Sequence, residues 1–381
     1  MFHDYSSTPV RANPPKVDEI EVSLFGPGHG ECVLIHVGSG SWIVIDSCLD
    51  QRARRQPALH YLSRIGVDAA SQVKVVLASH WHRDHVMGLS EVVRECVSAD
   101  FWTSAAFREQ ELLRMTRRTG KLKLTRHNAF AEFHDVMERL SVRSDGFGGL
   151  PVVRLASAGK MIYRATRSGE PKVVVEAISP SDRDVLAAMT ALSALVPGSG
   201  ASEFAVREPQ PNEAAIALRV QLGDAVVLLG SDLEEPETPS TDRGWTAAVG
   251  HASLRGQPAT VFKVAHHGSR TGHCPAVWSE LLAPNSHALI TPFRPSGLPR
   301  SDDLQRLHQA TARVYLAARV EQPPAGRHER AERPIVRGHV IAMREPEGRA
   351  GHIRLRAHAN ATSPDDWRVE LEPPARRVIA V

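Results

Sequence analysis

The sequence lacks any apolar run near the ~18 residues that a membrane-spanning helix needs, which excludes a chain that crosses a bilayer by helices. The first residues, MFHDYSSTPVRANPPK, contain no apolar stretch of the signal-peptide kind, and we expect residues 1–18 to form a flexible tail. Cysteine is scarce, and no CxxC spacing occurs among the four cysteines, Cys32, Cys48, Cys96 and Cys274. This usage disfavours a disulfide scaffold and favours a reducing cytoplasm.

Charge of one sign is also in short supply, because 46 Lys and Arg stand against 43 Asp and Glu, a net charge of +3. That balance excludes a protein that coats nucleic acid by charge alone. Hydrophobic residues make up 42% and charged residues 23%, values that exclude wholesale disorder, collagen-like repeats and coiled coils. Histidine, in contrast, is abundant, with 19 residues. This excess points to a metal site.

Short strands and helices alternate along most of the chain. Hydrophobic periodicity predicts strands at 19–25, 32–37, 42–46, 73–79, 161–166, 173–178, 260–265, 287–291 and 313–317, and helices at 53–66, 104–118, 127–141 and 301–311. The segments AAIALRV and AVVLLG predict a hairpin that turns at Gly223 and Asp224, and the region of about 335–372 predicts strands only. The alternation excludes pure α and pure β folds and predicts an α/β (α+β) protein with sheet layers covered by helices.

The strongest chemical signal is the segment SHWHRDHVMG at 79–88, directly after the apolar strand 73–79. His80 and His82 share one face if the segment is extended, because side chains of a strand alternate. Asp84 and His85 follow the bend and can address a second point nearby. Imidazole and carboxylate groups suit Zn²⁺, Mn²⁺ or Fe²⁺. A metal site is therefore favoured over a histidine-rich surface loop, since loops that end buried strands often carry function.

Two other strand ends carry residues of the same chemical type. Asp232 follows AVVLLG, where the cap of a helix would explain it equally well by itself. His266 and His267 follow the strand 260–265 in KVAHHGS, where Val or Ile would pack better than paired histidines. Three such strand ends predict one common edge of the sheets at which a site assembles.

The sequence resembles the metallo-β-lactamase fold hydrolases in the order of its motifs, which are HWHRDH, then Gly-Ser-Asp after a hairpin, then HHGS. It is most similar to the β-lactamase-like domain of ComEC-type DNA-uptake proteins, on the segments FGPGHGECVLIHVG, WIVIDSC, VEAISPSD and NEAAIALRVQLGDAVVLLGSDLE and on the VYL tail with its strands. The resemblance implies an αββα sandwich of two mixed β-sheets flanked by helices. The hydrolase domain would span 19–345, with a helical insertion at about 103–145, followed by a C-terminal β extension at 346–381.

The resemblance also implies two divalent metal ions, Zn²⁺ first and Mn²⁺ as the alternative. The implied ligands lie at the three strand ends: His80 and His82 on the first ion, Asp84 and His85 on the second, and Asp232 between them. One of His266 and His267 would complete the second site; His266 is favoured, and the choice stays open.

Asp46, after the strand 42–46, would hold the ligand loop as carboxylates behind metal-bound histidines do; an ordinary turn aspartate is the alternative. Asp84 and Asp46 are thus the residues expected to serve catalysis. Many proteins of the wider fold place a third histidine on the first ion in a GHTPG-like segment, which this sequence lacks. His127 and His134 lie on a predicted helix and are expected to be surface or core residues. The first ion would then be weakly held or completed by water.

The segment 114–127 is basic and contains no acidic residue. It predicts either a solvated helix face or a rim that grips phosphates, formed by Arg114, Arg117, Arg118, Lys121, Lys123 and Arg126. Ser269 and His273, beyond HHGS, are candidates to orient a substrate or protonate a leaving group. The segment GPGHG at 26–30 does not match the dinucleotide pattern GxGxxG and predicts a close backbone approach near the site.

The leading hypothesis is a metal-dependent phosphodiesterase or nuclease, in which a hydroxide generated at two cations acts on nucleic acid or another phosphodiester. The alternative is hydrolysis of a small ester, thioester or lactam, against which the missing GHTPG-like segment argues modestly. A second alternative is a metal-binding scaffold without turnover. The intact HWHRDH, Asp232 and HHGS segments argue against that scaffold. No membrane partner is expected.

Overall fold

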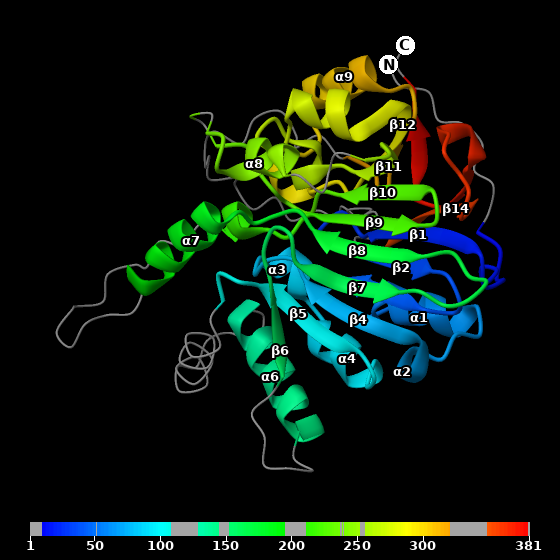
Figure 1. Cartoon of the computed structure of the whole chain (residues 1–381), viewed down its shortest axis with the longest axis vertical. Coiled ribbons are helices and arrows are strands. Elements are labelled where there is room, and N and C mark those ends of the chain that lie inside the picture. Colours follow the sequence, from blue (N-terminus) through cyan, green and yellow to red (C-terminus); the bar gives the residue numbers. More distant parts are fainter. Residues whose placement is uncertain are drawn as a thin grey trace, which may run out of the picture.

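The computed structural model of the chain describes residues 10–50, 52–107, 129–144, 152–194, 211–236, 238, 240–251, 256–320 and 349–379. In this part of the chain the strands form two eight-stranded sheets that pack face to face (Figure 1). Within the described residues, none of the helices combines the length and the apolar character that a membrane crossing requires.

The first sheet runs in the order β15-β14-β1-β2-β3-β4-β5-β6. Its strands are β1 (Glu19–Gly26), β2 (Cys32–Val37), β3 (Trp42–Ile45), β4 (Val73–Ala78), β5 (Asp100–Ser104), β6 (Val153–Ala156), β14 (Gly351–His358) and β15 (Arg368–Glu372). The strands from β3 to β6 are parallel neighbours, and the remaining pairs are antiparallel.

The second sheet runs in the order β16-β13-β12-β11-β10-β9-β8-β7. Its strands are β7 (Met161–Ala165), β8 (Val173–Ala177), β9 (Leu218–Leu222), β10 (Ala225–Leu229), β11 (Ala259–Lys263), β12 (Leu282–Ile290), β13 (Val314–Leu316) and β16 (Arg376–Val378). The strands from β10 to β13 are parallel, and the others pair antiparallel. Both sheets are therefore mixed.

Helices cover the outer faces of the two sheets (Figure 1). On the first sheet lie α1 (Pro57–Arg64), α2 (Ala69–Gln72), α3 (Arg83–Val86), α4 (Leu89–Glu95) and α6 (Ala129–Ser144). With the second sheet lie α8 (Gly244–Gly250), the π-helical turn η4 (Val277–Leu281) and α9 (Ser301–Ala310), whereas α7 (Asp182–Ala194) projects away from the sandwich (Figure 1). Short 3₁₀ turns are η1 (Pro211–Ala214), η3 (Ala265–Gly268), η5 (Arg294–Ser296) and η6 (Pro364–Asp366).

Three apolar cores follow from this layering. One lies between the sheets and is formed by strand residues such as Val22, Val75 and Val227. A second joins the first sheet to its helices, and a third joins the second sheet to α8, η4 and α9. The strands of the parallel regions are covered on both faces, which explains their continuous apolar sequences. The predicted class, two mixed sheets flanked by helices, is confirmed.

Several elements differ from the sequence-based expectation. Strands β5 and β6 were not expected, and a helix was expected to start at 104, where the structure has the last residue of β5. Both strands are short and lie in the parallel half of the first sheet, so tertiary pairing overrides a weak local pattern. Helix α1 is shorter than 53–66 because Pro57 opens it. Helix α7 was also not expected, whereas α6 lies close to the helix predicted at 127–141.

The segment expected as a C-terminal β extension supplies strands to both sheets. β14 pairs with β1 along eight residue pairs, from Glu19 with His358 to Gly26 with Gly351, and β16 pairs with β13. Of the expected tail, the structure describes residues 10–18, and here Arg354 and Arg356 donate to the carbonyl oxygens of Arg11 and Asn13 at 2.8 and 2.6 Å.

Candidate metal centre

The histidines and aspartates singled out by the sequence gather at one edge of the sandwich. They follow β4 in the first sheet and β10 and β11 in the second. β10 and β11 are parallel neighbours, so their carboxyl ends lie side by side. A backbone hydrogen bond from Ile216 to the carbonyl oxygen of Ser79, 3.0 Å long, ties the second sheet to the end of β4. The three strand ends therefore share one place, as predicted.

The segment after β4 supplies four of the side chains. Nε2 of His80 lies 3.1 Å from Nδ1 of His82, so the two imidazoles converge. His82 immediately precedes the short helix α3, which carries Asp84 and His85, both buried. The helix turns these two side chains to the other side of the site from His82.

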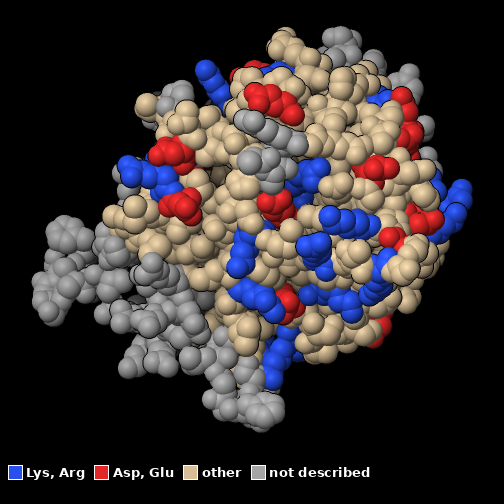
Figure 2. All heavy atoms as spheres, viewed as in Figure 1, with Lys and Arg blue, Asp and Glu red and all other residues tan. Residues whose placement is uncertain are grey.

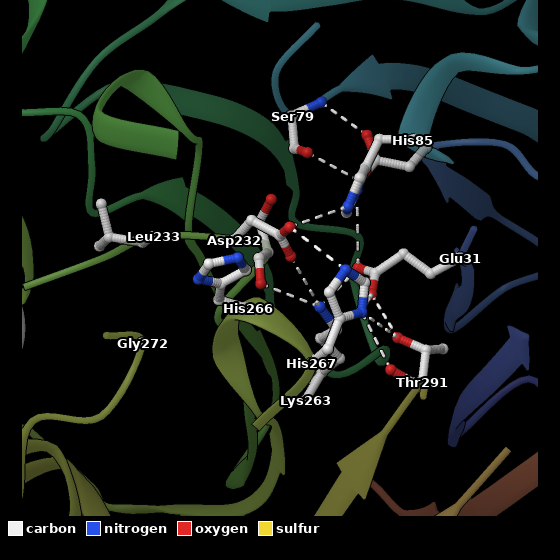
Figure 3. A network of polar contacts seen from close by, with 12 residues as sticks. Glu31, Ser79, His85, Asp232, Leu233, Lys263, His266, His267, Gly272 and Thr291 are labelled. Atoms are coloured by element: carbon white, nitrogen blue, oxygen red, sulfur yellow. Dashed lines mark hydrogen bonds and ion pairs between the residues drawn. The ribbon is translucent and has the colours of Figure 1, made fainter. Parts of the chain in front are cut away.

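Asp232 lies between the two groups. Its Oδ2 atom is 3.2 Å from Nε2 of His85, 3.4 Å from Nε2 of His267 and 3.9 Å from Nε2 of His80. Figure 3 shows Asp232, His85 and His267 directed toward one another. Asp232 does not start a helix, because the next one, α8, begins at Gly244. The carboxylate therefore lies between the two sets of imidazoles and does not cap a helix.

The two adjacent histidines of η3 point in different directions (Figure 3). Nε2 of His267 lies 3.4 Å from Oδ2 of Asp84, and the ring is almost fully buried. His266 instead places Nδ1 2.6 Å from Oε1 of Glu234 and 2.9 Å from Oγ1 of Thr271. Both residues have left-handed backbone angles, φ 45° and 55°, which turn the chain between them. The sequence favoured His266, whereas the structure brings His267 to the centre.

Two groups of potential ligands contain Asp232, with all ligand atoms of each group within 4.8 Å of one another. The first contains His80, His82 and Asp232, and the second contains Asp84, His85, Asp232 and His267. Imidazole and carboxylate sets of this kind suit Zn²⁺ and similar ions. Asp232 belongs to both groups.

The protonation pattern of His85 supports cation binding. Its Nδ1 lies 2.7 Å from Oδ2 of Asp46, so in the neutral ring Nδ1 carries the proton and Nε2 carries a lone pair. That buried Nε2 has no hydrogen-bond partner among the described residues. It faces the carboxylate oxygens of Asp232 and Asp84 at 3.2 and 3.7 Å. Lone pairs and carboxylates repel one another at these distances unless a cation or a proton lies between them, so the residues fit a metal ion.

The electrostatics of the metal-free site agree with this interpretation. Burial lowers the pKa of His267, but the carboxylates of Asp232, Asp84 and Glu31 outweigh it and raise that pKa to about 10. His85 behaves likewise, since burial is outweighed by Asp232, Glu31 and Asp84, and its pKa lies well above the usual value. In contrast, burial and the neighbouring His85 and His82 hold the pKa of His80 well below its usual value. Protons on His267 and His85 therefore occupy the place that a metal ion would take.

Asp46 holds the ligand loop from behind. Its Oδ1 accepts a hydrogen bond from the backbone N–H of Ser79 at 2.7 Å, and its Oδ2 accepts one from the Ser79 hydroxyl at 2.7 Å. The same Oδ2 accepts from His85, as described above. Burial raises the pKa of Asp46, against the opposing effect of His85. Asp46 thus fixes the end of β4 and, in the neutral ring, the tautomer of His85.

A buried ion pair that the sequence did not single out lies beneath the ligands (Figure 3). Nζ of Lys263 is 2.5 Å from Oε1 of Glu31 and donates to the carbonyl oxygen of Ser231 at 2.9 Å. Both side chains are only 1% exposed. Lys263 also lies 3.8 Å from Oδ1 of Asp232, and Glu31 accepts from Thr291 at 2.5 Å. Two features of the sequence could have predicted this pair: a lysine ends the apolar strand β11, and a glutamate follows the Gly-rich turn.

The remaining predicted site residues lie elsewhere. The hydroxyl of Ser269 is 3.1 Å from that of Thr271, and His273 lines a small cavity of about 10 Å³ together with residues of η4 and α9. Neither is among the converging ligand atoms. His134 lies on α6 beside Asp135 and Glu138. Outside the described residues are His127 and the basic set Arg114, Arg117, Arg118, Lys121, Lys123 and Arg126.

Comparison with known proteins supports the fold. Residues 25–153 match the family model described as the Metallo-beta-lactamase superfamily. A search of curated proteins finds no match.

Two solved structures illustrate the likeness. The metallo-beta-lactamase fold protein YhfI from Bacillus subtilis is 12% identical, with 79% of this chain and 96% of that chain covered and a TM-score of 0.38. Zn²⁺-bound PqqB from Methylobacterium extorquens is 11% identical, with 74% and 84% covered and a TM-score of 0.37. Similarity at this level is weak. The matched segment, which contains β2 to β5 and the HWHRDH sequence, and the two-sheet architecture together identify the fold of this chain as the metallo-β-lactamase fold.

Proposed function

We propose that this protein is a metal-dependent phosphodiesterase that acts on nucleic acid. The observation that carries the proposal is Asp232, whose Oδ2 atom faces both ligand groups. A shared carboxylate suits a pair of divalent ions held close together, and two-metal sites of that kind are typical of phosphatases and nucleases.

In this proposal His80, His82 and Asp232 would hold one ion, and Asp84, His85, Asp232 and His267 would hold the other. When bound, two divalent ions lower the pKa of a water molecule and neutralise the charge that develops on a phosphoryl group.

The residues of the chain contribute orientation. In the neutral ring of His85, Asp46 holds the proton on Nδ1 and leaves the lone pair of Nε2 aimed at the centre, and the backbone carbonyl oxygen of Thr291, 2.9 Å from Nδ1 of His267, does the same for the neutral form of that ring. Lys263 lies against Asp232 and Glu31, so the excess negative charge beneath the ligands is partly balanced. Preorganised donors and charges of this kind need no rearrangement when a substrate binds.

Cations near the site fit an anionic substrate. Arg83, exposed and next to Asp84, and Arg294, whose backbone N–H donates to the carbonyl oxygen of Gly28 at 2.9 Å, lie on either side of the Gly-rich turn. Both can contact phosphate groups without competing for the metal ligands.

A second group of cations lies farther along the second sheet. Lys160, Arg164, Arg167 and Lys172 are exposed on and beside β7 and β8, and Figure 2 shows Lys and Arg side chains gathered on this face, with Asp and Glu among them. The backbone N–H of Ala177 donates to the carbonyl oxygen of Lys160. Ala177 is the strand partner of Leu218, and Leu218 is the strand partner of Leu229, just before the loop of Asp232. Three strand spacings separate Lys160 from that loop, roughly 14 Å. A polyanion could therefore contact these cations while one of its phosphates lies at the centre.

Elemental analysis of the purified protein followed by a substrate panel tests the proposal. We expect about two transition-metal ions per chain, and turnover of bis-p-nitrophenyl phosphate and of DNA or RNA with Mn²⁺ or Zn²⁺. The same preparation is given nitrocefin and a thioester. Turnover of these two substrates without turnover of any phosphodiester would reject the proposed substrate class, and metal content near zero after dialysis against Zn²⁺ and Mn²⁺ would reject the metal centre.

A further inference from the structure

The Gly-rich turn between β1 and β2 holds His29 beside the centre, on the side of Asp84 and His267. The turn is tied on both sides: the backbone N–H of Glu31 donates to the carbonyl oxygen of Asp84 at 3.0 Å, and that of Arg294 donates to the carbonyl oxygen of Gly28 at 2.9 Å. One contact holds the turn to the helix that carries two ligands, and the other holds it to the loop after β12. His29 therefore has a defined position and does not lie on a free loop.

The glycines on either side of His29 make this close approach possible. Gly28 and Gly30 have φ angles of 87° and 104°, which side chains other than glycine rarely adopt. A Cβ atom at Gly28 would lie 2.5 Å from Nε of Arg294, and one at Gly30 would lie 2.8 Å from the carbonyl oxygen of Asp84. The sequence GPGHG thus brings the backbone against the site and leaves His29 as the side chain that the turn presents there.

An aromatic stack connects His29 to a ligand. Its ring centroid lies 5.4 Å from that of Phe293, and the ring of Phe293 stacks on His267 at 5.0 Å with an interplanar angle of 17°. The stack places His29 on the Asp84 and His267 side of the centre. The atoms of His29 are not among the groups of converging ligands found in the described part of the chain, so it stands beside the metal site and not in it.

One nitrogen of this ring is without a partner. Nδ1 of His29 is buried and has no hydrogen-bond partner among the described residues, although a buried polar atom ordinarily has one. The ring as a whole is partly exposed, so a bound molecule can reach it. Burial lowers the pKa of His29; Asp84 opposes this effect, and Arg83 and His267 add to it. The neutral ring offers one N–H donor to an anion at the centre.

We propose that His29 is a further catalytic residue, which donates a hydrogen bond to an oxygen of the substrate phosphate on the Asp84 and His267 side of the centre. This inference rests on the proposed function. Phe293 holds the ring in place, and the glycines hold the backbone. Because the donor would contact the phosphate in the bound substrate as well as during the reaction, its removal should weaken binding at least as much as turnover.

Two variants separate the nitrogen from the ring. His29→Phe keeps an aromatic ring against Phe293 but removes both nitrogens, and His29→Gln keeps a hydrogen-bond donor but loses the ring. Each is loaded with Zn²⁺ or Mn²⁺ and compared with the wild type for metal content, for kcat and KM on bis-p-nitrophenyl phosphate, and for binding of inorganic phosphate by calorimetry. His60→Phe, a histidine on α1 away from the ligands, is the control for loss of a histidine.

We expect unchanged metal content in all variants. His29→Phe should lower kcat/KM about 10–100-fold, the range for one hydrogen bond to a charged group, with most of the change in KM and a parallel loss in phosphate affinity. His29→Gln should recover most of both. Phosphate affinity in His29→Phe equal to that of the wild type overturns the inference, as does a loss of metal.

Failure of the proposed function would look different. The wild type would then hold two metal ions without any phosphodiester turnover, and the phosphate-binding comparison would still decide on His29. Equal losses in His29→Phe and His29→Gln, with metal retained, would mean that a hydrogen-bond donor at this position does not restore phosphate binding, which also overturns the inference.

Discussion

Replacement of Asp232 by alanine should reduce the metal content from two ions to at most one, weakly held. Among the described residues, Asp232 is the one side chain that both ligand groups share. Without it the first group retains only His80 and His82, which are too few for a stable site. The second group retains Asp84, His85 and His267, so it can still hold an ion with one ligand less.

The magnitude follows from the charges. Unit charges 4 Å apart interact by about 4 kcal/mol at an effective dielectric constant of about 20, and two divalent ions at the same distance repel by about four times as much. The carboxylate between them offsets this repulsion. If only about 4 kcal/mol is left uncompensated, affinity for the second ion falls about a thousandfold. Asp232→Asn keeps the shape and loses the charge, so it should also retain at most one ion.

The assay measures metal content after dialysis, phosphodiester turnover, circular dichroism and melting temperature on Asp232→Ala, Asp232→Asn and His80→Ala. His80→Ala is the matched control, because it leaves all four members of the second group in place and should keep one tightly held ion. Circular dichroism should not change, since Asp232 lies outside the helices and strands of the described residues and caps none of those helices. Two firmly bound ions in Asp232→Ala would refute the bridging role.

Four further predictions concern groups around the centre. His267→Ala should lose the ion of the second group, whereas His266→Ala should keep both ions and lower the activity by about 10–100-fold at most. Equal and mild effects of both variants on metal content and turnover would mean that the HHGS segment is not part of the site. Because the pKa of His267 is raised to about 10 in the metal-free protein, this ring is protonated at pH 7 and must lose its proton when a metal ion binds. Calorimetry in buffers of different ionisation enthalpy should detect this proton release. The apparent affinity for the metal should also rise with pH up to about 10. Lys263→Met should lower the free energy of unfolding in urea by about 3–5 kcal/mol, because it leaves the buried Glu31 carboxylate without its partner. The double variant with Glu31→Gln should recover part of this loss. A loss in the double variant equal to the sum of the two single losses would contradict a buried pair. Burial lowers the pKa of His36 to about 4, below the value of about 6.5 in the unfolded chain. The contribution of His36 to the free energy of unfolding is therefore complete above pH 6.5, and about 3 kcal/mol of it is lost as the pH falls toward 4. His36→Gln should make the free energy of unfolding depend less on pH in this range.

The local pattern of the strands predicted much of the scaffold. Runs such as VKVVLAS and AVVLLG are apolar because their strands lie in a sheet that is covered on both faces, and they appear in the structure as β4 and β10. Strands β5 and β6 were not predicted, because their short segments acquire a strand conformation only by pairing with β4 and with each other. Such pairing joins residues 25 positions apart between β4 and β5 and 52 positions apart between β5 and β6, and it leaves little trace in local periodicity.

The sequence by itself determined which kinds of ligand the protein can present and that they follow three strand ends. His80, His82, Asp84 and His85 are close in sequence, and their spacing is enough to place the first two on one face and the last two at a second point nearby. This information is local, because side-chain direction over a few residues follows from backbone geometry.

Only the tertiary structure decided which of the two histidines in HHGS faces the centre. The left-handed backbone at both residues breaks the alternation of the strand, and the direction of His267 depends on the carbonyl oxygen of Thr291, which directly follows β12. The same holds for Glu31 and Lys263, which are far apart in sequence and meet beneath Asp232. Their partnership depends on how the two sheets pack, since a buried charge is stable only where the fold brings it an opposite charge and hydrogen bonds.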